Sequence, residues 1–208
     1  MKKIVIIGSP GAGKSTLAQA LAHILNIEVF HLDRYFWQYG WKEYPRETRI
    51  KIEQQLIGDK DRWIIEGTYF SSSDSRLQAA DTIIFLDMPP LFCFWQAVKR
   101  HIRYRGCSRP DIPDGCTDRL GLLYILKILV FPRRGKKLLL RKFAEIPLLG
   151  IDEPQKKTIL TFRSHQELDD FLLKLSSQQQ EAQASYEEHG HPQEPVAEEA
   201  KECVLTTT

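Results

Sequence analysis

The sequence predicts an α/β fold: a five-stranded parallel sheet covered by helices on both faces. Short apolar runs recur along the chain, and longer segments with helical apolar spacing separate them. The runs occupy residues 3–7, 28–32, 62–67, 81–87 and 157–162. Strands that alternate with helices in this way are typical of parallel sheets. The chain has 208 residues, of which 42% are hydrophobic, and this is enough for one domain with a sizeable core.

The first predicted strand, residues 3–7, leads directly into a glycine-rich loop. The loop matches the pattern G-x-x-x-x-G-K-[ST] at Gly8, Gly13, Lys14 and Ser15. Glycines let backbone N–H groups approach an anion, the lysine reaches the β- and γ-phosphates, and the serine hydroxyl can bind Mg²⁺. Residues 15–26 have helical spacing, so a helix N-terminus should face the phosphates. The alternative interpretation is a turn that binds nothing.

Prolines mark the start of two further helices. Pro45 can open a helix over residues 46–58, because its fixed φ suits the first helical turn. Pro89 and Pro90 can open another over residues 91–105 for the same reason.

Two more helices are expected later in the chain, one before and one after the last predicted strand. Residues 120–131 form the most apolar run, but they are too short to span a bilayer and contain Lys127. We expect a packed amphipathic helix there. Ser164 followed by Glu167 forms a capping box, which predicts a helix over residues 165–175.

Charge divides the chain into two parts. The net charge is +2, but residues 176–208 carry seven Glu and one Lys, a net charge of −6, so residues 1–175 carry +8. The acidic segment has almost no apolar periodicity and cannot bury enough surface to offset its ordering entropy. We therefore predict a folded domain over residues 1–175 and a disordered acidic tail over residues 176–208.

Cysteine usage favours a reduced, cytoplasmic setting, and no secretory signal precedes the first strand. The four cysteines form no disulfide pattern. Cys107, Cys116 and His101 could supply three metal ligands, one fewer than a structural zinc site usually takes.

Three carboxylates come at the carboxyl ends of predicted strands, where ligands bind in parallel sheets. Asp33 follows the second strand, Glu66 ends the third and Asp87 ends the fourth. Two of them could hold Mg²⁺ through its waters, and one could accept a proton from an attacking hydroxyl. The structural alternatives are a helix cap for Asp87 or Asp33 and a simple strand end for Glu66.

An aromatic segment, HLDRYFWQYGW, surrounds Asp33 at residues 31–41. Aromatic rings offer flat faces for a base or for another apolar ring. The candidate ligand-binding rings are Tyr35, Trp37 and Trp41. The alternative is an aromatic cluster that covers the edge of the sheet.

A basic stretch follows the fourth strand. From Lys99 to Lys142, thirteen Lys and Arg stand against three Asp, a net charge of +10. Several of the arginines surround GCSRPDIPDGC, a composition typical of a loop. An arginine-rich loop beside a phosphate loop predicts a lid, because arginine forks chelate phosphate oxygens. A solvated basic face or a nucleic-acid surface is the alternative.

Together these segments resemble the nucleoside-monophosphate-kinase-like P-loop kinases. The likeness covers residues 1 to about 175 and is carried by GSPGAGKST, LD at 32–33, WIIEGTY at 63–69, Arg76 before ADTIIFLDMP and the arginines from 100 onward. Within this group the chain is most similar to adenylate-kinase-related proteins called DNA topology modulation proteins. Their HLD-aromatic-W pattern is similar to residues 31–41.

The resemblance implies a three-layer P-loop kinase fold with an Arg-rich lid at about residues 100–142. It also implies transfer of the γ-phosphate of ATP, with Mg²⁺, to a nucleotide, nucleoside or other small acceptor. The residues implied to bind nucleotide are Gly8, Ser9, Pro10, Gly11, Ala12, Gly13, Lys14, Ser15 and Thr16, with Ser15 at the metal. Those implied or proposed at the acceptor are Asp33, Tyr35, Trp37, Trp41, Glu66 and Arg76. The catalytic candidates are Lys14, Asp33, Arg103, Arg105 and Arg109.

Two observations bear on the acceptor and on other partners. EGTYF at residues 66–70 stands where adenylate kinases have D-G-F-P-R, so the sequence does not specify AMP as the acceptor. The rival hypothesis is an ATP-binding regulatory or DNA-associated protein without a small-molecule acceptor. We find no helix-turn-helix and no zinc-finger spacing, so a nucleotide and a small acceptor are the favoured partners, with no membrane partner.

Overall fold

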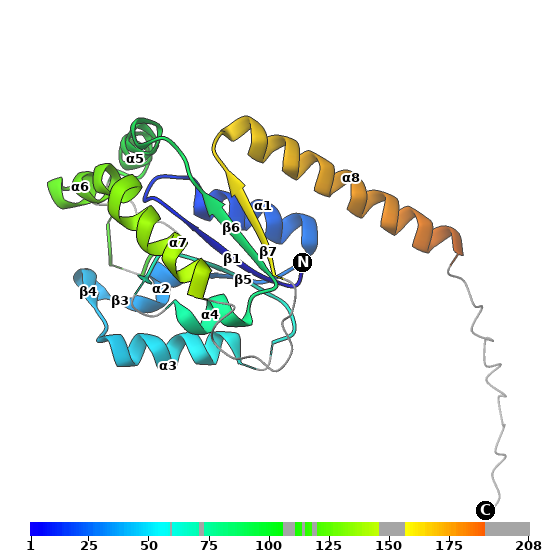
Figure 1. The fold of residues 1–208 in the computed structure, drawn as a ribbon, viewed down its shortest axis with the longest axis horizontal. Helices are drawn as coiled ribbons and strands as arrows, with labels where there is room; N and C mark the ends of the chain where they lie inside the picture. The colour runs from blue at the N-terminus through cyan, green and yellow to red at the C-terminus, as the bar shows by residue number, and fades with distance from the viewer. Residues whose placement is uncertain are drawn as a thin grey trace, which may run out of the picture.

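A five-stranded parallel sheet in the order β2-β5-β1-β6-β7 lies at the centre of the molecule (Figure 1). The computed structural model describes residues 1–58, 60–70, 73–105, 111–113, 115–117, 120–145 and 157–189. The strands are β1 (Lys3–Gly8), β2 (Val29–His31), β5 (Trp63–Glu66), β6 (Thr82–Leu86) and β7 (Thr158–Phe162). The five predicted strands and the predicted fold class are confirmed.

Eight helices are assigned in the described part of the chain. They are α1 (Lys14–Leu25), α2 (Leu32–Phe36), α3 (Arg46–Ile57), α4 (Asp74–Ala79), α5 (Pro90–Arg103), α6 (Leu122–Val130), α7 (Lys136–Glu145) and α8 (His165–His189). A π-helical turn (Phe131–Gly135) joins α6 to α7. The helices predicted after the phosphate loop, after Pro45, after Pro89 and after Ser164 are all present.

The core has two halves, one on each face of the sheet, which gives three layers. Successive side chains of a strand point to opposite faces, so Ile4 and Ile6 of β1 pack with α1, α5 and α8. Val5 and Ile7 pack on the other face with α2, α4 and α7. These four side chains are at most 2% exposed, as expected for a central parallel strand.

The aromatic segment 31–41 has more regular structure than its sequence suggested. It begins with the last residue of β2 and continues as helix α2. A small antiparallel hairpin follows, formed by β3 (Trp37–Gln38) and β4 (Lys42–Glu43) around the 3₁₀ turn Tyr39–Trp41. The hairpin places residues 37–43 beyond the carboxyl edge of the main sheet.

Helix α8 begins where the capping box predicted and ends later than expected. Ser164 Oγ accepts a hydrogen bond from the Glu167 N–H (3.2 Å), and the Glu167 carboxylate accepts one from the Arg163 N–H (2.8 Å). The helix continues to His189, whereas we predicted disorder from residue 176. The difference has a local cause, because residues 176–189 are rich in Gln, Glu and Ala, which favour helix even without a core to pack against.

Helix α6 is present as predicted, but it is not packed on all its apolar sides. Only Ile128 of this helix is buried, while Leu122, Leu123, Leu126, Leu129 and Val130 are exposed. No helix within the described ranges has the length and apolar character needed to cross a membrane.

Candidate active site

The glycine-rich loop joins β1 to α1 through two glycines in left-handed conformations. Gly11 and Gly13 have positive φ angles of 80° and 91°, which turn the backbone sharply before the helix. Gly13 is the N-cap of α1, and no side chain caps this helix end. The first N–H groups of α1 therefore remain available to an anion, and the residues fit the phosphates of a nucleotide.

Gly11 is the loop position with the least room for a side chain. A Cβ built there would lie 2.2 Å from the carbonyl oxygen of Cys93 on α5, in addition to the positive φ. We expect Gly11→Ala to lower the free energy of unfolding by about 2–3 kcal/mol, because backbone must move and the left-handed conformation is strained. Gly121→Ala is the matched control, since nothing lies within 4 Å of its added Cβ. Urea unfolding of both variants measures the difference, and equal stability would contradict the prediction.

Ser15 and Glu66 are joined directly at the carboxyl edge of the sheet. Ser15 Oγ donates a 2.9 Å hydrogen bond to Glu66 Oε1, and His31 Nδ1 lies 2.9 Å from the same oxygen. The strand register explains the contact between His31 and Glu66, because His31 of β2 pairs with Glu66 of β5. Glu66 thus stands against the phosphate loop, and with Ser15 it offers oxygen ligands of the kind that Mg²⁺ prefers.

The electrostatics of this cluster keep Glu66 ionised. Burial alone would raise the pKa of Glu66, but hydrogen bonds from His31 and Ser15 and the charge of Lys14 hold that pKa below its ordinary value. Burial likewise opposes protonation of His31, yet the adjacent Glu66 carboxylate raises the pKa of the imidazole. Lys14 Nζ itself donates to the carbonyl oxygen of Ser9, 3.1 Å away in the same loop.

Asp33 lies on α2 and is held by a tyrosine from a different segment. The Tyr69 hydroxyl donates a hydrogen bond to Asp33 Oδ1, and Trp37 Nε1 donates one to the Tyr69 oxygen at 2.7 Å. Burial, together with the charge of Asp33, raises the pKa of Tyr69 far above its ordinary value, so this hydroxyl stays a donor. Tyr69 belongs to EGTYF, the segment that departs from the adenylate kinase pattern.

The aromatic rings of residues 31–41 divide between core and surface. Phe36 is fully buried, and Tyr35 packs edge-on against Phe30 with ring centroids 6.1 Å apart. Trp37 and Trp41 lie edge-to-face at 5.5 Å and are partly exposed. Trp41 Nε1 also donates to the carbonyl oxygen of Thr117 at 2.9 Å, which ties the hairpin to the predicted lid. Trp37 is the candidate ring that also contacts the Asp33–Tyr69 pair.

Arg76 does not face an acceptor as we predicted. Its side chain is fully buried on α4 and forms an ion pair with Glu53 of α3, which is fully buried as well. The guanidinium also donates to the carbonyl oxygens of Gly67 (3.4 Å) and Tyr69 (3.2 Å). Arg76 therefore positions the segment that carries Tyr69, because a completely buried guanidinium has no surface to offer a ligand.

Breaking this buried pair should be costly. We expect Glu53→Gln to lower the free energy of unfolding by about 3–5 kcal/mol, because it leaves the charge of Arg76 buried without its counter-ion. Glu28→Gln is the matched control, since the Lys60–Glu28 pair is 44% and 60% exposed. Its loss should cost less than about 1 kcal/mol. Urea unfolding tests both variants, and a small effect of Glu53→Gln would contradict the structural role of the pair.

The predicted lid is largely helical in its described part. Arg103 is the last residue of α5, Arg105 follows two positions later, and both are exposed. Arg109 lies outside the described residues. Asp87 forms an ion pair with Lys136 of α7 at 2.6 Å and does not cap α5. Of the three carboxylates considered, Glu66 contacts the phosphate loop, Asp33 lies in the predicted acceptor segment and Asp87 ties down α7.

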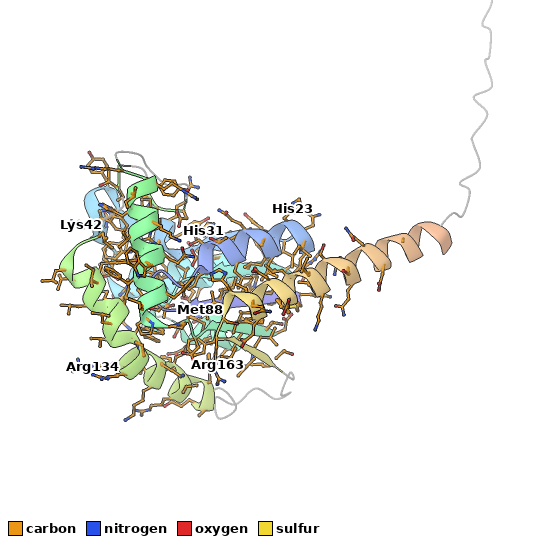
Figure 2. The ribbon with its side chains drawn as sticks, turned by 90° about the horizontal axis from the view of Figure 1, so that it is seen from above. His23, His31, Lys42, Met88, Arg134 and Arg163 are labelled. Atoms are coloured by element: carbon orange, nitrogen blue, oxygen red, sulfur yellow. The ribbon has the colours of Figure 1, made fainter. Side chains whose placement is uncertain are left out.

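A cavity of about 210 Å³ lies beyond the ends of β6 and β7. It is lined by Met88, Pro89, Phe92, Arg163, Ser164 and His165. Figure 2 labels Met88 and Arg163 of this set. The rings of Phe92 and His165 lie 4.8 Å apart between centroids. Phe92 precedes Cys93, the residue in contact with Gly11, so this mostly apolar hollow adjoins the phosphate loop.

Three residues of the site were not predicted from the sequence. His31 and Tyr69 hydrogen-bond to Glu66 and Asp33, and Glu53 neutralises Arg76. The sequence held a partial signal for His31, which directly precedes the LD pair at the end of a strand. Tyr69 stood out only as a departure from a known pattern. Glu53 gave no signal, because its partner is remote in sequence.

Among curated proteins, the chain is similar in sequence to shikimate kinases and to one uncharacterized protein. No protein-family model matches the chain. A shikimate kinase from a type A strain of Clostridium botulinum is 25% identical over 148 residues, which cover 64% of this chain and 84% of that enzyme. The uncharacterized protein YqaC of Bacillus subtilis is 31% identical over 90 residues, or 42% of this chain and 50% of YqaC.

Solved structures agree with the sequence relatives. The shikimate kinase of Bacteroides thetaiotaomicron has a TM-score of 0.50 at 17% identity, covering 84% of this chain and 96% of its own. The shikimate kinase of Acinetobacter baumannii, in complex with shikimate, has a TM-score of 0.52 at 15% identity, covering 84% and 92%. These similarities confirm the predicted α/β P-loop kinase fold. None of these relatives is described as a DNA topology modulation protein.

Proposed function

We propose that this chain is an ATP-dependent kinase that transfers the γ-phosphoryl group to a hydroxyl of a small acceptor. The shikimate kinase relatives support an ATP-dependent kinase. One observation in the structure carries the proposal further. The phosphate loop is hydrogen-bonded through Ser15 to Glu66 and so to His31, and Asp33 follows His31 by two residues. A nucleotide-binding loop and a positioned carboxylate thus share one edge of the sheet.

Each residue of the site has a task in this reaction. The N–H groups at the start of α1 and the ammonium of Lys14 bind the phosphates of ATP. Ser15 and Glu66 would hold Mg²⁺, which when bound neutralises charge on the phosphates. Asp33, oriented by the Tyr69 hydroxyl, accepts the proton of the acceptor hydroxyl or orients that hydroxyl toward the γ-phosphate. Arg103 and Arg105, exposed at the end of α5 and just after it, would supply positive charge from the lid.

The cavity beside the phosphate loop suits the base of the nucleotide. Its apolar lining and the paired rings of Phe92 and His165 offer a flat face at the side of Gly11. We assign the opposite side, between α2 and residues 66–70, to the acceptor. The presence of shikimate in the complex of the Acinetobacter baumannii enzyme makes a small hydroxylated acid the first acceptor to test.

The experiment is a screen of acceptor-dependent ADP formation. Purified protein with ATP and Mg²⁺ is given shikimate, then nucleosides, nucleoside monophosphates and other small hydroxy compounds. A kinase should form ADP and a phosphorylated product only with its acceptor. ATP binding without turnover on any acceptor would contradict the proposal and favour the regulatory alternative. Salt-sensitive DNA binding under the same conditions would favour the DNA-associated alternative.

A further inference from the structure

Helix α6 carries a row of large apolar side chains that face away from the protein. They are Leu122, Leu123, Leu126, Leu129 and Val130, together called the α6 face below. Leu122 and Leu123 are 73% and 76% exposed, whereas Ile128 on the other side of the helix is fully buried. At 3.6 residues per turn the five positions fall within an arc of about 120°. One side of α6 packs on the core, and the other presents a contiguous apolar surface, which is typical of an interaction site.

Uncompensated positive charge flanks the α6 face. Residues 120–144 contain seven Lys and Arg and no acidic residue. Four of the seven are exposed and form no ion pair among the described residues: Lys127, Arg133, Arg134 and Lys137. Arg133 and Arg134 lie in the π-helical turn directly after α6, and Figure 2 shows Arg134 at the outer edge of the molecule. Figure 1 shows α6 at the end of the molecule remote from the C-terminal end of α8.

We propose that the α6 face docks this protein on an anionic lipid bilayer, with α6 lying in the plane of the membrane surface. Exposed leucines beside lysines and arginines are the pattern of an interfacial helix. The leucines would enter the boundary between headgroups and acyl chains, and the basic side chains would meet the phosphate headgroups. Helix α6 lies within the segment predicted as the lid, and the proposal does not depend on the identity of the acceptor. A lipid surface as partner departs from our sequence-based expectation of no membrane partner.

Other partners match only part of this surface. In a symmetric contact with a second copy, the basic residues of both copies would lie close together, and like charges repel. Nucleic acid would match the charge, but its interfaces are polar and would leave the leucines without apolar partners. An anionic bilayer satisfies the leucines and the basic side chains together.

Vesicle sedimentation tests the proposal on the full chain. The vesicles contain phosphatidylcholine alone or with a minor fraction of phosphatidylglycerol. We expect affinity for the anionic vesicles to be at least about tenfold higher at roughly 0.1 M salt. The difference should shrink at roughly 1 M salt, because screening then acts over a few ångströms.

Two sets of variants identify the surface. Leu122→Gln with Leu126→Gln should lower affinity for anionic vesicles by about tenfold or more, because two apolar side chains no longer leave water. Leu173→Gln on α8 is the matched control, since Leu173 is 67% exposed and lies outside the α6 face. Arg133→Gln with Arg134→Gln should lower affinity for anionic vesicles and weaken its salt dependence. The exposed positions predict unchanged melting temperatures, which checks that each variant folds.

Several results would overturn the proposal. Wild-type protein that stays in solution with anionic vesicles would do so, as would a double leucine variant that binds them like the wild type. A wild-type dimer that dissociates in the same leucine variant would also overturn it, because the α6 face would then be an interface between copies.

Discussion

Replacing Lys14 with Ala is expected to weaken ATP binding by about 100-fold while leaving the fold intact. Lys14 is the first residue of α1, and its ammonium already points back along the phosphate loop to the carbonyl oxygen of Ser9. With nucleotide bound, the same group would make charge-assisted hydrogen bonds to two phosphates. Such bonds contribute about 1.5–3 kcal/mol each, so two at the lower end of this range contribute about 3 kcal/mol, which is a factor of somewhat more than about 100 in affinity. Calorimetric titration of ATP into the variant measures the change.

The design of this test depends on separating binding from stability. Lys14 is not part of the buried core, so the melting temperature of the Lys14→Ala variant should stay close to that of the wild type. Lys174→Ala on the exposed side of α8 is a matched control that removes one positive charge far along the chain from the loop. Wild-type ATP affinity in Lys14→Ala would exclude the predicted role of this lysine.

The central sheet could be predicted because its signals are local and continuous. Buried parallel strands need apolar side chains on both faces, so β1, β5 and β6 each contain a continuous apolar run: IVII, WII and IIFL. The start of α8 was equally accessible, because Ser164 and Glu167 cap it within one turn. The C-terminal end of α8 could not be predicted, because we interpreted low apolar periodicity as disorder in a segment that has high helix propensity.

The aromatic segment shows where local patterns stop being informative. Five aromatic residues in eleven were compatible with both hypotheses, core and ligand surface, and in the structure the rings divide between buried and partly exposed positions. Phe36 completes the core, while Trp37 and Trp41 remain partly exposed. A helix of five residues followed by two-residue strands has too few positions for a period to be recognised.

In the candidate site too, local motifs could be recognised from the sequence, whereas contacts between remote segments could not. The phosphate loop is a contiguous motif, and the rule that ligands bind at strand carboxyl ends located Glu66 and Asp33. Pairing between remote segments was beyond the sequence. Arg76 was assigned to the acceptor because an arginine before a strand matched a family pattern, and the partner that buries it, Glu53, is 23 residues away. A buried carboxylate changes the task of an arginine from binding ligand to holding a loop.

Tyr69 connects the buried Arg76–Glu53 pair to Asp33 of the candidate site. The Arg76 guanidinium holds the backbone carbonyl of Tyr69, and the Tyr69 hydroxyl in turn holds Asp33. A segment that looked like a missing acceptor motif is therefore the support of the candidate catalytic carboxylate. Tyr69→Phe should reduce turnover less than removal of the Asp33 charge, because the carboxylate remains while its orientation loosens.

Asp33→Asn is expected to lower turnover by about 1,000-fold with little change in ATP affinity, once an acceptor is found. Proton transfer by a positioned carboxylate contributes about 10²–10⁴ in rate, and the amide keeps the size of Asp33 but cannot take a proton. Tyr69 can still donate to the amide oxygen, so the geometry of α2 should survive. The phosphate loop is unchanged, so ATP should bind as before.

Steady-state turnover and ATP titration, measured on the same preparation, separate the two effects. Asp170→Asn is the matched control, an exposed carboxylate on α8 whose loss should leave turnover unchanged. A fall in ATP affinity equal to the fall in turnover would indicate a damaged nucleotide site instead of a lost catalytic group. Full turnover in Asp33→Asn would remove Asp33 from the mechanism. Glu66, already hydrogen-bonded to Ser15, would then be the carboxylate on which phosphoryl transfer depends.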